Sequence, residues 1–311
     1  MRTLPSLMDL NPQQLRYLLA ISRAGSFVKA AEALNVSQPA LSVAISRLED
    51  VVGAKLLERG RHGAQLTNAG QHLIRHAESV EMVLAAARDE MQLFDQGVKG
   101  PLTVGGTPLG TASIIPDVIG QLCEEISHVH VRVVEDVDEA LIDRLLRHEL
   151  DLVISNLGLT HNPSEIEAIP LFTARAVAVV RPGHEYCDRK LLTLGDLARY
   201  TCVLPPEGGA LRKQIEALFT INSMPFPTNV IEAAPFGVLK EIVRRSDGVT
   251  ILSDQIVRSE LLNGALIAIP LREQMAVRTF GLQMLKGRKL GTLARRFTEI
   301  ATQVAPNYSM T

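Results

Sequence analysis

Apolar residues recur at helical spacing three times within the first 66 positions, and a short segment with a charged, glycine-containing middle follows them. The spacing predicts helices over 12–24, 27–34 and 37–52, and the last segment predicts a β-hairpin over 56–66. Two short helices, a tight turn, a third helix and a hairpin are the arrangement of a winged helix-turn-helix.

The third predicted helix separates an apolar face from a polar one. Leu41, Ile45 and Leu48 face inward, whereas Gln38 and Arg47 lie on the opposite side. A glutamine near the start of such a helix can reach an adenine edge in the major groove, and serine hydroxyls suit phosphates. The alternative is a plain three-helix unit with solvated charges. The residues predicted to contact DNA are Ser26, Ser37, Gln38, Pro39, Ala40, Ser42, Ser46, Arg47, Arg59 and Arg61.

Residues 67–96 predict one long helix with a continuous apolar seam. The seam positions alternate steps of four and three, which is the pattern of a coiled coil. We expect this helix to join two copies of the chain, although a helix packed on its own domain is the alternative. The predicted seam residues are Leu73, Ala77, Val80, Leu84, Ala87, Met91 and Phe94. Glycine and proline then predict a hinge over 97–101.

From residue 102 onward, short apolar strands alternate with helical stretches, one of them over 111–123. Repeated βα units predict an α/β fold with mostly parallel sheets and helices on both faces. Sheets of this kind bind small molecules beyond the carboxyl ends of their strands. The candidates follow the first strand, end the third strand, begin a lobe-two strand or open a lobe-two helix, and each is also readable as an ordinary loop or cap residue. The predicted ligand contacts are Thr107, Pro108, Ser155, Asn156, Cys202, Pro235 and Phe236.

The charge is unevenly divided along the 311 residues. Residues 1–66 hold eight cationic and five anionic side chains, a net charge of +3, so the remainder carries −5 of the total of −2. A basic head on an acidic body indicates that only the head meets a polyanion. The absence of tryptophan argues against a single-strand binder that stacks bases on aromatic rings. No apolar run is long enough to cross a membrane, and no signal peptide precedes the head, so we expect a cytoplasmic protein.

Neither the cysteines nor the histidines form a recognisable chemical site. The three cysteines, Cys123, Cys187 and Cys202, are too widely spaced for a metal pair or a disulfide framework. His128 and His130 alternate along a strand without further ligands, and no catalytic motif is present. We therefore expect no enzyme, no metal and no cofactor. A small-molecule binding or transport protein and an enzyme with an appended DNA-binding head are the alternatives.

The segment AAEALNVSQPALS from Ala30 to Ser42, with Arg47-Leu48-Glu49 and Leu66-Thr67-Asn68-Ala69-Gly70 after it, resembles the winged helix-turn-helix of LysR-type transcriptional regulators. The remainder resembles the two-lobed α/β effector domain of that family, which is like a periplasmic binding protein. The match is ordered over about sixty residues of the head and much weaker in the body.

The resemblance implies a sequence-specific transcriptional regulator controlled by a small-molecule effector bound between the two lobes. It further implies a homodimer or homotetramer on an inverted-repeat operator of double-stranded DNA, with RNA polymerase as a further partner and no membrane attachment. The implied domains are a DNA-binding head at 1–66, a dimerisation linker at 67–96 and an effector-binding domain at 97–311, with lobe one at 101–173 plus 269–311 and lobe two at 174–268.

Overall fold

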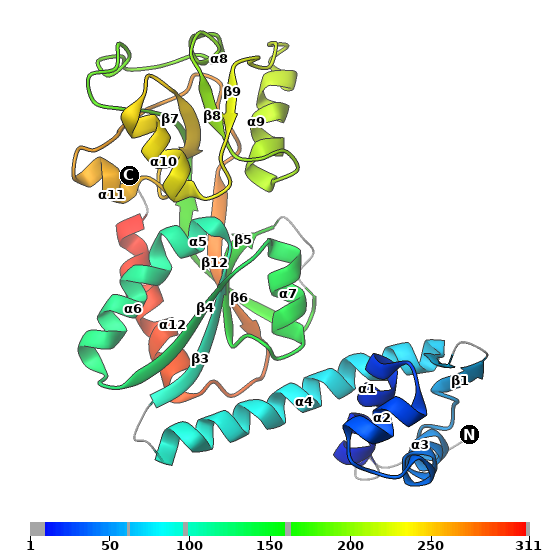
Figure 1. Cartoon of the computed structure of the whole chain (residues 1–311). Helices are drawn as coiled ribbons and strands as arrows, with labels where there is room; N and C mark the ends of the chain where they lie inside the picture. The colour runs from blue at the N-terminus through cyan, green and yellow to red at the C-terminus, as the bar shows by residue number, and fades with distance from the viewer. Residues whose placement is uncertain (1–9, 61–62, 96–98, 159–162, 309–311) are drawn as a thin grey trace. The chain divides into compact units, whose positions relative to one another are not determined.

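Three helices and a hairpin form the N-terminal head, as the sequence pattern predicts (Figure 1). Their bounds are α1 (Pro12–Ala24), α2 (Phe27–Ala33), α3 (Gln38–Val52), β1 (Leu57–Gly60) and β2 (Gly63–Leu66). The computed structural model describes residues 10–60, 63–95, 99–158 and 163–308. They divide into two units, Met1–Pro101 with Asp143–Leu150 and Leu102–Ile142 with Asp151–Thr311.

Local signals set the ends of the head helices. Ser37 Oγ accepts a hydrogen bond from Ala40 N at 3.3 Å and so caps α3, while Gly25 and Gly53 end α1 and α3 in the left-handed conformation. Ser26 occupies the N-cap position of α2, but its side chain makes no capping bond. The three helices enclose one apolar core, of which the fully buried residues include Leu18, Ile21, Ala30, Leu41, Leu48 and Leu56.

The long helix α4 (Asn68–Asp95) divides its apolar residues between two environments. Thr67 Oγ1 caps it by accepting from Gly70 N at 3.0 Å. Ala77 is 1% exposed within the head's own core, and Leu73 and Val80 pack against that core. Ala77 is therefore wrong as a seam residue, because the apolar face of α1 needs a cover and α4 supplies it. Farther along, Leu84 and Met91 are 55% and 60% exposed.

Lobe one is built on a five-stranded sheet in the order β4-β3-β5-β12-β6. Helices α6 and α12 lie side by side on one face of it and enclose the larger apolar core (Figure 1). Its elements are β3 (Lys99–Gly106), α5 (Pro108–Ala112), α6 (Ile114–Glu125), β4 (Val129–Glu135), α7 (Asp138–Leu146), β5 (Leu152–Leu157), β6 (Ile166–Ala174), β12 (Arg278–Leu285), α12 (Thr292–Val304) and a 3-10 turn at Ala305–Tyr308.

Lobe two holds two smaller sheets, β10-β7-β11 and β8-β9. Its elements are β7 (Ala176–Val180), α8 (Leu194–Leu197), β8 (Cys202–Leu204), α9 (Ala210–Ile221), β9 (Val230–Glu232), α10 (Phe236–Arg245), β10 (Thr250–Ser253), α11 (Arg258–Leu262) and β11 (Ile267–Ile269). No helix among the residues described is both long and apolar enough to cross a membrane.

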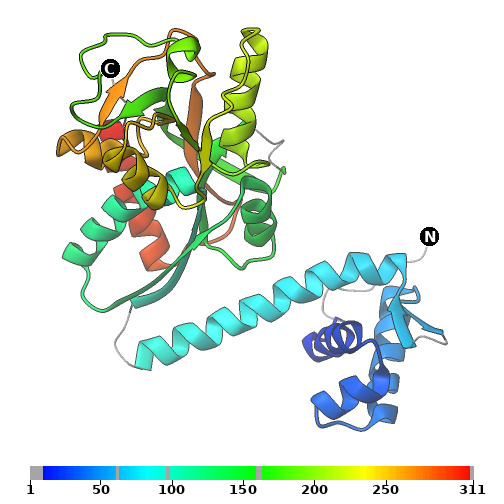
Figure 2. The same ribbon diagram turned by 45° about the horizontal axis from the view of Figure 1, so that its top comes forward.

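The expectation of mostly parallel sheets is wrong. The pairs β3-β5 and β8-β9 are parallel, but β12 runs antiparallel to β5 and β6, and β7 runs antiparallel to β10 and β11. The reason is the path between the lobes: β6 carries the chain out of lobe one and β12 brings it back alongside. Figure 2 shows the two crossings from a second side.

Three predicted boundaries also need correction. A continuous helix over 111–123 would place Pro116 in its interior, where the ring would clash with a carbonyl, so the chain breaks at Ser113 and restarts at Ile114. Lys99 to Pro101, expected in the hinge, begin β3, while residues 97 and 98 lie outside the described residues.

The chain returns from lobe two to lobe one later than residue 269, where the sequence analysis expects lobe one to resume. Ile269 and Leu271 are buried in the lobe-two core, and Met275 packs against it. Lobe two therefore extends to about Met275, after which β12 enters lobe one.

Candidate DNA-binding face and ligand site

The outward face of α3 mixes polar residues with small or apolar ones, among them Val43, which is 51% exposed. Ser37, Pro39, Ala40, Ser46 and Arg47 are exposed, whereas Gln38 and Ser42 are half-buried. The opposite face is anchored in the head core, so the helix orientation is fixed by packing. The face offers hydrogen-bonding groups on Gln38, Ser42, Ser46 and Arg47, and Val43 offers an apolar contact, which are the two kinds of contact that read base edges in the major groove.

A hollow of about 270 Å³ opens in the head beside this face. It is lined by Phe27, Ser42, Ile45, Ser46, Glu49, Lys55 and Leu57. The start of α2, the polar face of α3 and the start of the wing strand β1 therefore border one concave surface. Ser26 immediately precedes Phe27 in the chain and therefore lies next to the lining of this hollow.

Glu49 fastens the wing to α3, a role that the sequence pattern did not indicate. Its carboxylate is 8% exposed and accepts hydrogen bonds from Lys55 Nζ at 2.5 Å, Leu56 N at 3.0 Å and Leu57 N at 3.4 Å. Burial alone would raise the pKa of Glu49, but the bonds from Lys55 and the two backbone N–H groups outweigh it, so the pKa lies below the ordinary value of 4.5.

We expect Glu49→Gln to reduce the unfolding free energy of the head by about 1.5–3 kcal/mol, because hydrogen bonds to a charged group are lost. The lowered pKa means that the carboxylate stabilises the fold above pH 4.5 and that this contribution disappears as the pH falls through the folded-state pKa. Melting curves between pH 7 and pH 3 test this. Glu58→Gln, at an exposed wing residue, is the control; equal acid sensitivity of Glu49→Gln and the native protein would contradict the role.

The predicted wing contacts are only partly described. Arg59 lies in β1 opposite Ala64, but its side chain is outside the described residues, as are the whole of Arg61 and His62. The wing is held against the head by a hydrogen bond from Ala64 N to Gly25 O at 2.9 Å. The described backbone therefore supports a docked hairpin.

Predicted ligand contacts from lobe one gather at one edge of its sheet. Thr107 follows β3, and Ser155 and Asn156 lie in the last half of the adjacent parallel strand β5. All three are buried, with Thr107 and Asn156 at 7% and Ser155 at 1% exposure. Pro108, which is half-buried, begins α5 immediately beyond. The structure thus brings these four residues together at the carboxyl ends of two strands.

Sequence reasoning missed three polar residues at this edge. Gln283 Nε2 donates to Ser155 Oγ at 2.5 Å, and Asp138 Oδ1 accepts from Asn156 N at 3.2 Å. Burial raises the pKa of Asp138, against the effect of the hydrogen bonds from Asn156 and Ser155. Arg278 stands at the start of β12, beside β5. Only the pairing of β12 with β5 reveals Gln283 and Arg278, because more than a hundred residues separate Gln283 from Ser155, and Asp138 joins them from the start of α7.

Lobe two approaches this edge through apolar contacts. Leu109, directly after Pro108, packs against both the lobe-one core and a lobe-two cluster that includes Val179 and Leu239. Phe236, at the start of α10, packs against the same cluster, while Pro235 is exposed. Phe236 and Leu109 therefore share one apolar neighbourhood, as expected for residues that border a ligand from opposite lobes.

The C-terminal turn also ties the lobes together. Gln255 Nε2 of lobe two donates to Tyr308 O at 2.9 Å, and Arg258 donates to Asn307 O at 3.2 Å. The Tyr308 hydroxyl bonds to Asp117 in lobe one. The lobes are thus held in a defined arrangement by polar as well as apolar contacts.

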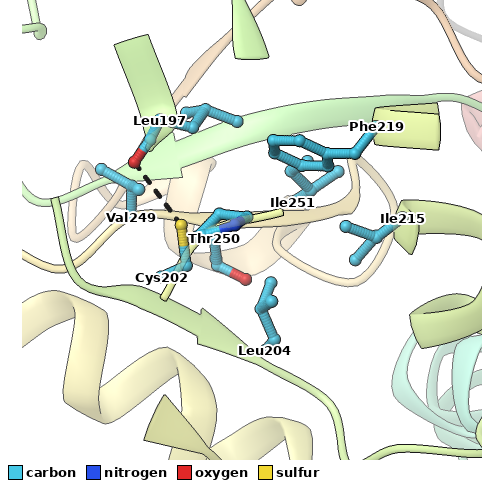
Figure 3. Close-up of a pocket in the computed structure, with 9 residues that line it drawn as sticks. Leu197, Cys202, Leu204, Ile215, Phe219, Val249, Thr250 and Ile251 are labelled. Atoms are coloured by element: carbon cyan, nitrogen blue, oxygen red, sulfur yellow. Dashed lines mark hydrogen bonds between the residues drawn. The ribbon is translucent and has the colours of Figure 1, made fainter. Parts of the chain in front are cut away.

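Cys202 is wrong as a ligand contact. It begins β8, so it lies at the amino end of that strand rather than the carboxyl end. Its side chain is 4% exposed inside lobe two and donates to Leu197 O at 3.5 Å, beside a cavity of about 10 Å³ (Figure 3). Burial raises the pKa of this thiol to about 11, which disfavours the reactive thiolate. Cys202 is a core residue.

Among the described residues, no group of three or more His, Cys, Asp and Glu side chains is placed to hold a metal ion. The described cysteines are free thiols: Cys123 is exposed, Cys187 half-buried and Cys202 buried.

Comparison with known proteins matches both halves of the chain. The model of the bacterial regulatory helix-turn-helix protein, lysR family, matches residues 12–71, and that of the LysR substrate binding domain matches residues 95–306. The SDS degradation transcriptional activation protein of Pseudomonas sp. (strain ATCC 19151) is 31% identical over 287 residues, 91% of this chain and 92% of that protein. The uncharacterized HTH-type transcriptional regulator YdcI of Escherichia coli is 29% identical over 258 residues, 83% of this chain and 84% of that protein.

Solved structures show the same fold. Full-length LysG from Corynebacterium glutamicum with bound effector Arg has a TM-score of 0.64 at 22% identity, covering 97% of this chain and 100% of that one. Full-length CbnR complexed with its target DNA has a TM-score of 0.61 at 19% identity, covering 94% and 99%. These matches confirm the resemblance to LysR-type regulators that the sequence indicates. The proteins of this family are transcriptional regulators rather than enzymes. The chain belongs to the LysR family of DNA-binding transcriptional regulators, which carry an effector-binding domain.

Proposed function

We propose that the head reads an operator through the outward face of α3, with the wing against the flanking backbone. The observation that carries this proposal is the division of α3 into a buried apolar face and an exposed face that carries Ser46 and Arg47 among small or apolar residues such as Ala40 and Val43. Gln38 stands in the first turn, where a side chain on a helix entering the major groove meets base edges. Ser37, Ser42, Ser46 and Arg47 then contact phosphates or neighbouring bases, as Ser26 does from the start of α2.

Two heads act together in this proposal. Leu84 and Met91, two of the exposed apolar residues of α4, meet the same residues of a second copy. Two-fold symmetry of the dimer then requires an inverted-repeat operator, and dimers of dimers give a tetramer. The domains are a head at 1–66, a linker at 67–96 and an effector-binding domain from 97, in which lobe two ends near Met275.

The effector binds at the polar edge formed by Thr107, Pro108, Ser155 and Asn156, with Phe236 of lobe two facing it. An effector shifts the population of lobe or subunit arrangements only if it binds them unequally. The linker helices transmit that shift to the spacing of the heads, and so to RNA polymerase at the promoter. The protein works in the cytoplasm, because bacterial operator DNA lies there.

The test of base reading is Gln38→Ala. DNA fragments selected from a random pool by the native protein supply the operator sequence. We expect Gln38→Ala to weaken binding to that sequence by about 1–3 kcal/mol and to relax one base preference, while binding to random DNA changes little.

Gln121→Ala, at an exposed glutamine in α6, is the matched control and should bind the selected sequence like the native protein. Equal losses on selected and random DNA would show that Gln38 does not read bases.

A further inference from the structure

Val43 occupies the outermost position of α3. At about 100° per residue, the buried residues Leu41, Ile45 and Leu48 centre on one side of the helix, and Val43 points almost directly away from them. Its side chain is 51% exposed. Apart from proline, Val28 and Val43 are the exposed apolar side chains larger than alanine in the described part of the head. Val43 therefore does not belong to the apolar core of the head.

Helix stability does not account for a valine at this position. Valine loses side-chain freedom in a helix and is a poorer helix former than alanine, lysine or glutamate. An exposed valine also gains little from burial that would offset this loss. The residue is therefore explained by something that covers it in the working complex, not by the fold of the head.

The charges along α3 indicate which half of the helix meets DNA. Residues 38–48 hold no acidic side chain, whereas Glu49 and Asp50 follow in the last turn. Asp50 is exposed on the same side of the helix as Val43, about two turns later, and its carboxylate repels phosphates. The N-terminal half of the outward face, which includes Val43, is therefore the part that approaches the duplex, as in other recognition helices.

The chemistry of the base edges identifies what Val43 meets. A valine side chain has no hydrogen-bonding group, so placing it against a base oxygen or nitrogen would remove water from that atom without replacing the lost bond. The apolar group that a base pair presents in the major groove is the 5-methyl group of thymine. A second protein is disfavoured as the occupant, because the polar side chains of Ser46 and Arg47 border Val43 and leave far less apolar area than a stable protein interface needs.

We propose that Val43 packs on the 5-methyl group of a thymine in each half of the operator and so selects thymine at that position. The proposal rests on the operator reading by α3 proposed above, and it adds a contact that recognises a methyl group rather than a hydrogen-bonding group. Val43 follows Gln38 by five residues, which places it about 7.5 Å farther along the helix axis. Because stacked base pairs are about 3.4 Å apart, the thymine lies within about three base pairs of the base that Gln38 reads.

The test removes the methyl group from the DNA and leaves the rest of the base in place. In the operator selected by the native protein, thymines are replaced by deoxyuridine, one symmetric pair at a time, and the affinity is measured by fluorescence anisotropy. Burial of one methyl group contributes about fourfold in affinity, so we expect one symmetric pair to lose about fifteenfold when both half-sites are changed. Val43→Ala should bind the thymine and deoxyuridine forms of that pair nearly equally. The variant should keep its fold, because Val43 is exposed and alanine favours a helix.

Two matched controls and a second DNA series make the assignment specific. Val28→Ala in α2 and Val238→Ala in α10, both at exposed valines, should keep the native preference for thymine over deoxyuridine. In the second series, a C·G pair replaces the T·A pair. The native protein should then bind 5-methylcytosine about fourfold more tightly than cytosine at each half-site, whereas Val43→Ala should not distinguish the two bases.

Selected half-sites without a thymine, an operator that is indifferent to deoxyuridine, or an undiminished thymine preference in Val43→Ala would each overturn the proposal. A preference that is lost in Val28→Ala instead would assign the contact to α2 and overturn it as well. If Gln38→Ala relaxes a base preference while deoxyuridine has no effect, operator reading by α3 stands and the role of Val43 fails. If the native protein selects no sequence from the random pool, both claims fail.

Discussion

Leu84→Arg should prevent two copies of the chain from associating through α4 and so reduce the mass of the protein in solution by at least half. Leu84 is 55% exposed and Met91 60% exposed on the half of α4 that does not pack on the head. A second copy that covers this stripe would bury an arginine with no acid opposite it, and an unpaired buried charge costs more than the apolar contact provides. Light scattering measures the mass.

The affinity of Leu84→Arg for the operator should fall together with its mass in solution. A linked pair of heads gains roughly 10²–10⁴ in affinity over a single head, so we expect Leu84→Arg to lose at least about 10²-fold on the selected DNA. Ala86→Arg adds the same side chain about 200° round the same helix and should preserve both mass and affinity. An unchanged mass for Leu84→Arg would place the dimer contact elsewhere.

The head was predictable from sequence because its signals are local. Asn11, Ser37, Gly25 and Gly53 mark helix ends within a few residues of the apolar positions they bound, and the structure places the helices accordingly. Ala77 was misassigned because a seam at steps of four and three looks the same whether it faces a second chain or the chain's own core. Only the packing of α1 on α4 separates the two.

The effector-binding domain was less predictable because its site depends on pairing between distant segments. Thr107 and Asn156 follow from the rule about strand ends, but Arg278 joins them through β12, which returns from the other lobe. The local sequence of a strand that crosses between the lobes does not indicate its direction, so the sequence did not predict that β12 runs antiparallel to β5 and β6. Cys202 failed for a different reason: the sequence places it at the start of its strand, but only the packing of lobe two shows that its side chain is buried in the core.

Gly63→Ala should detach the wing and abolish operator binding. A Cβ at Gly63 would lie 2.2 Å from Gly25 O, the same oxygen that accepts from Ala64 N at 2.9 Å. The residue also has φ +103°, a conformation that costs an L-residue roughly 1–3 kcal/mol. With the clash added, we expect the docked wing to lose at least about 3 kcal/mol, which is large for a single substitution.

Gly53→Ala separates the clash from the strain. Gly53 has φ +73° with no atom within 4 Å of the added Cβ, so it bears only the conformational cost, about 1–2 kcal/mol. Hydrogen exchange should show the Ala64 amide unprotected in Gly63→Ala and protected in Gly53→Ala, while strands β3 and β5 keep their protection in both. If Gly63→Ala retains that amide's protection and its affinity for the operator, contact between the wing and the α1–α2 turn does not hold the wing in its DNA-binding position.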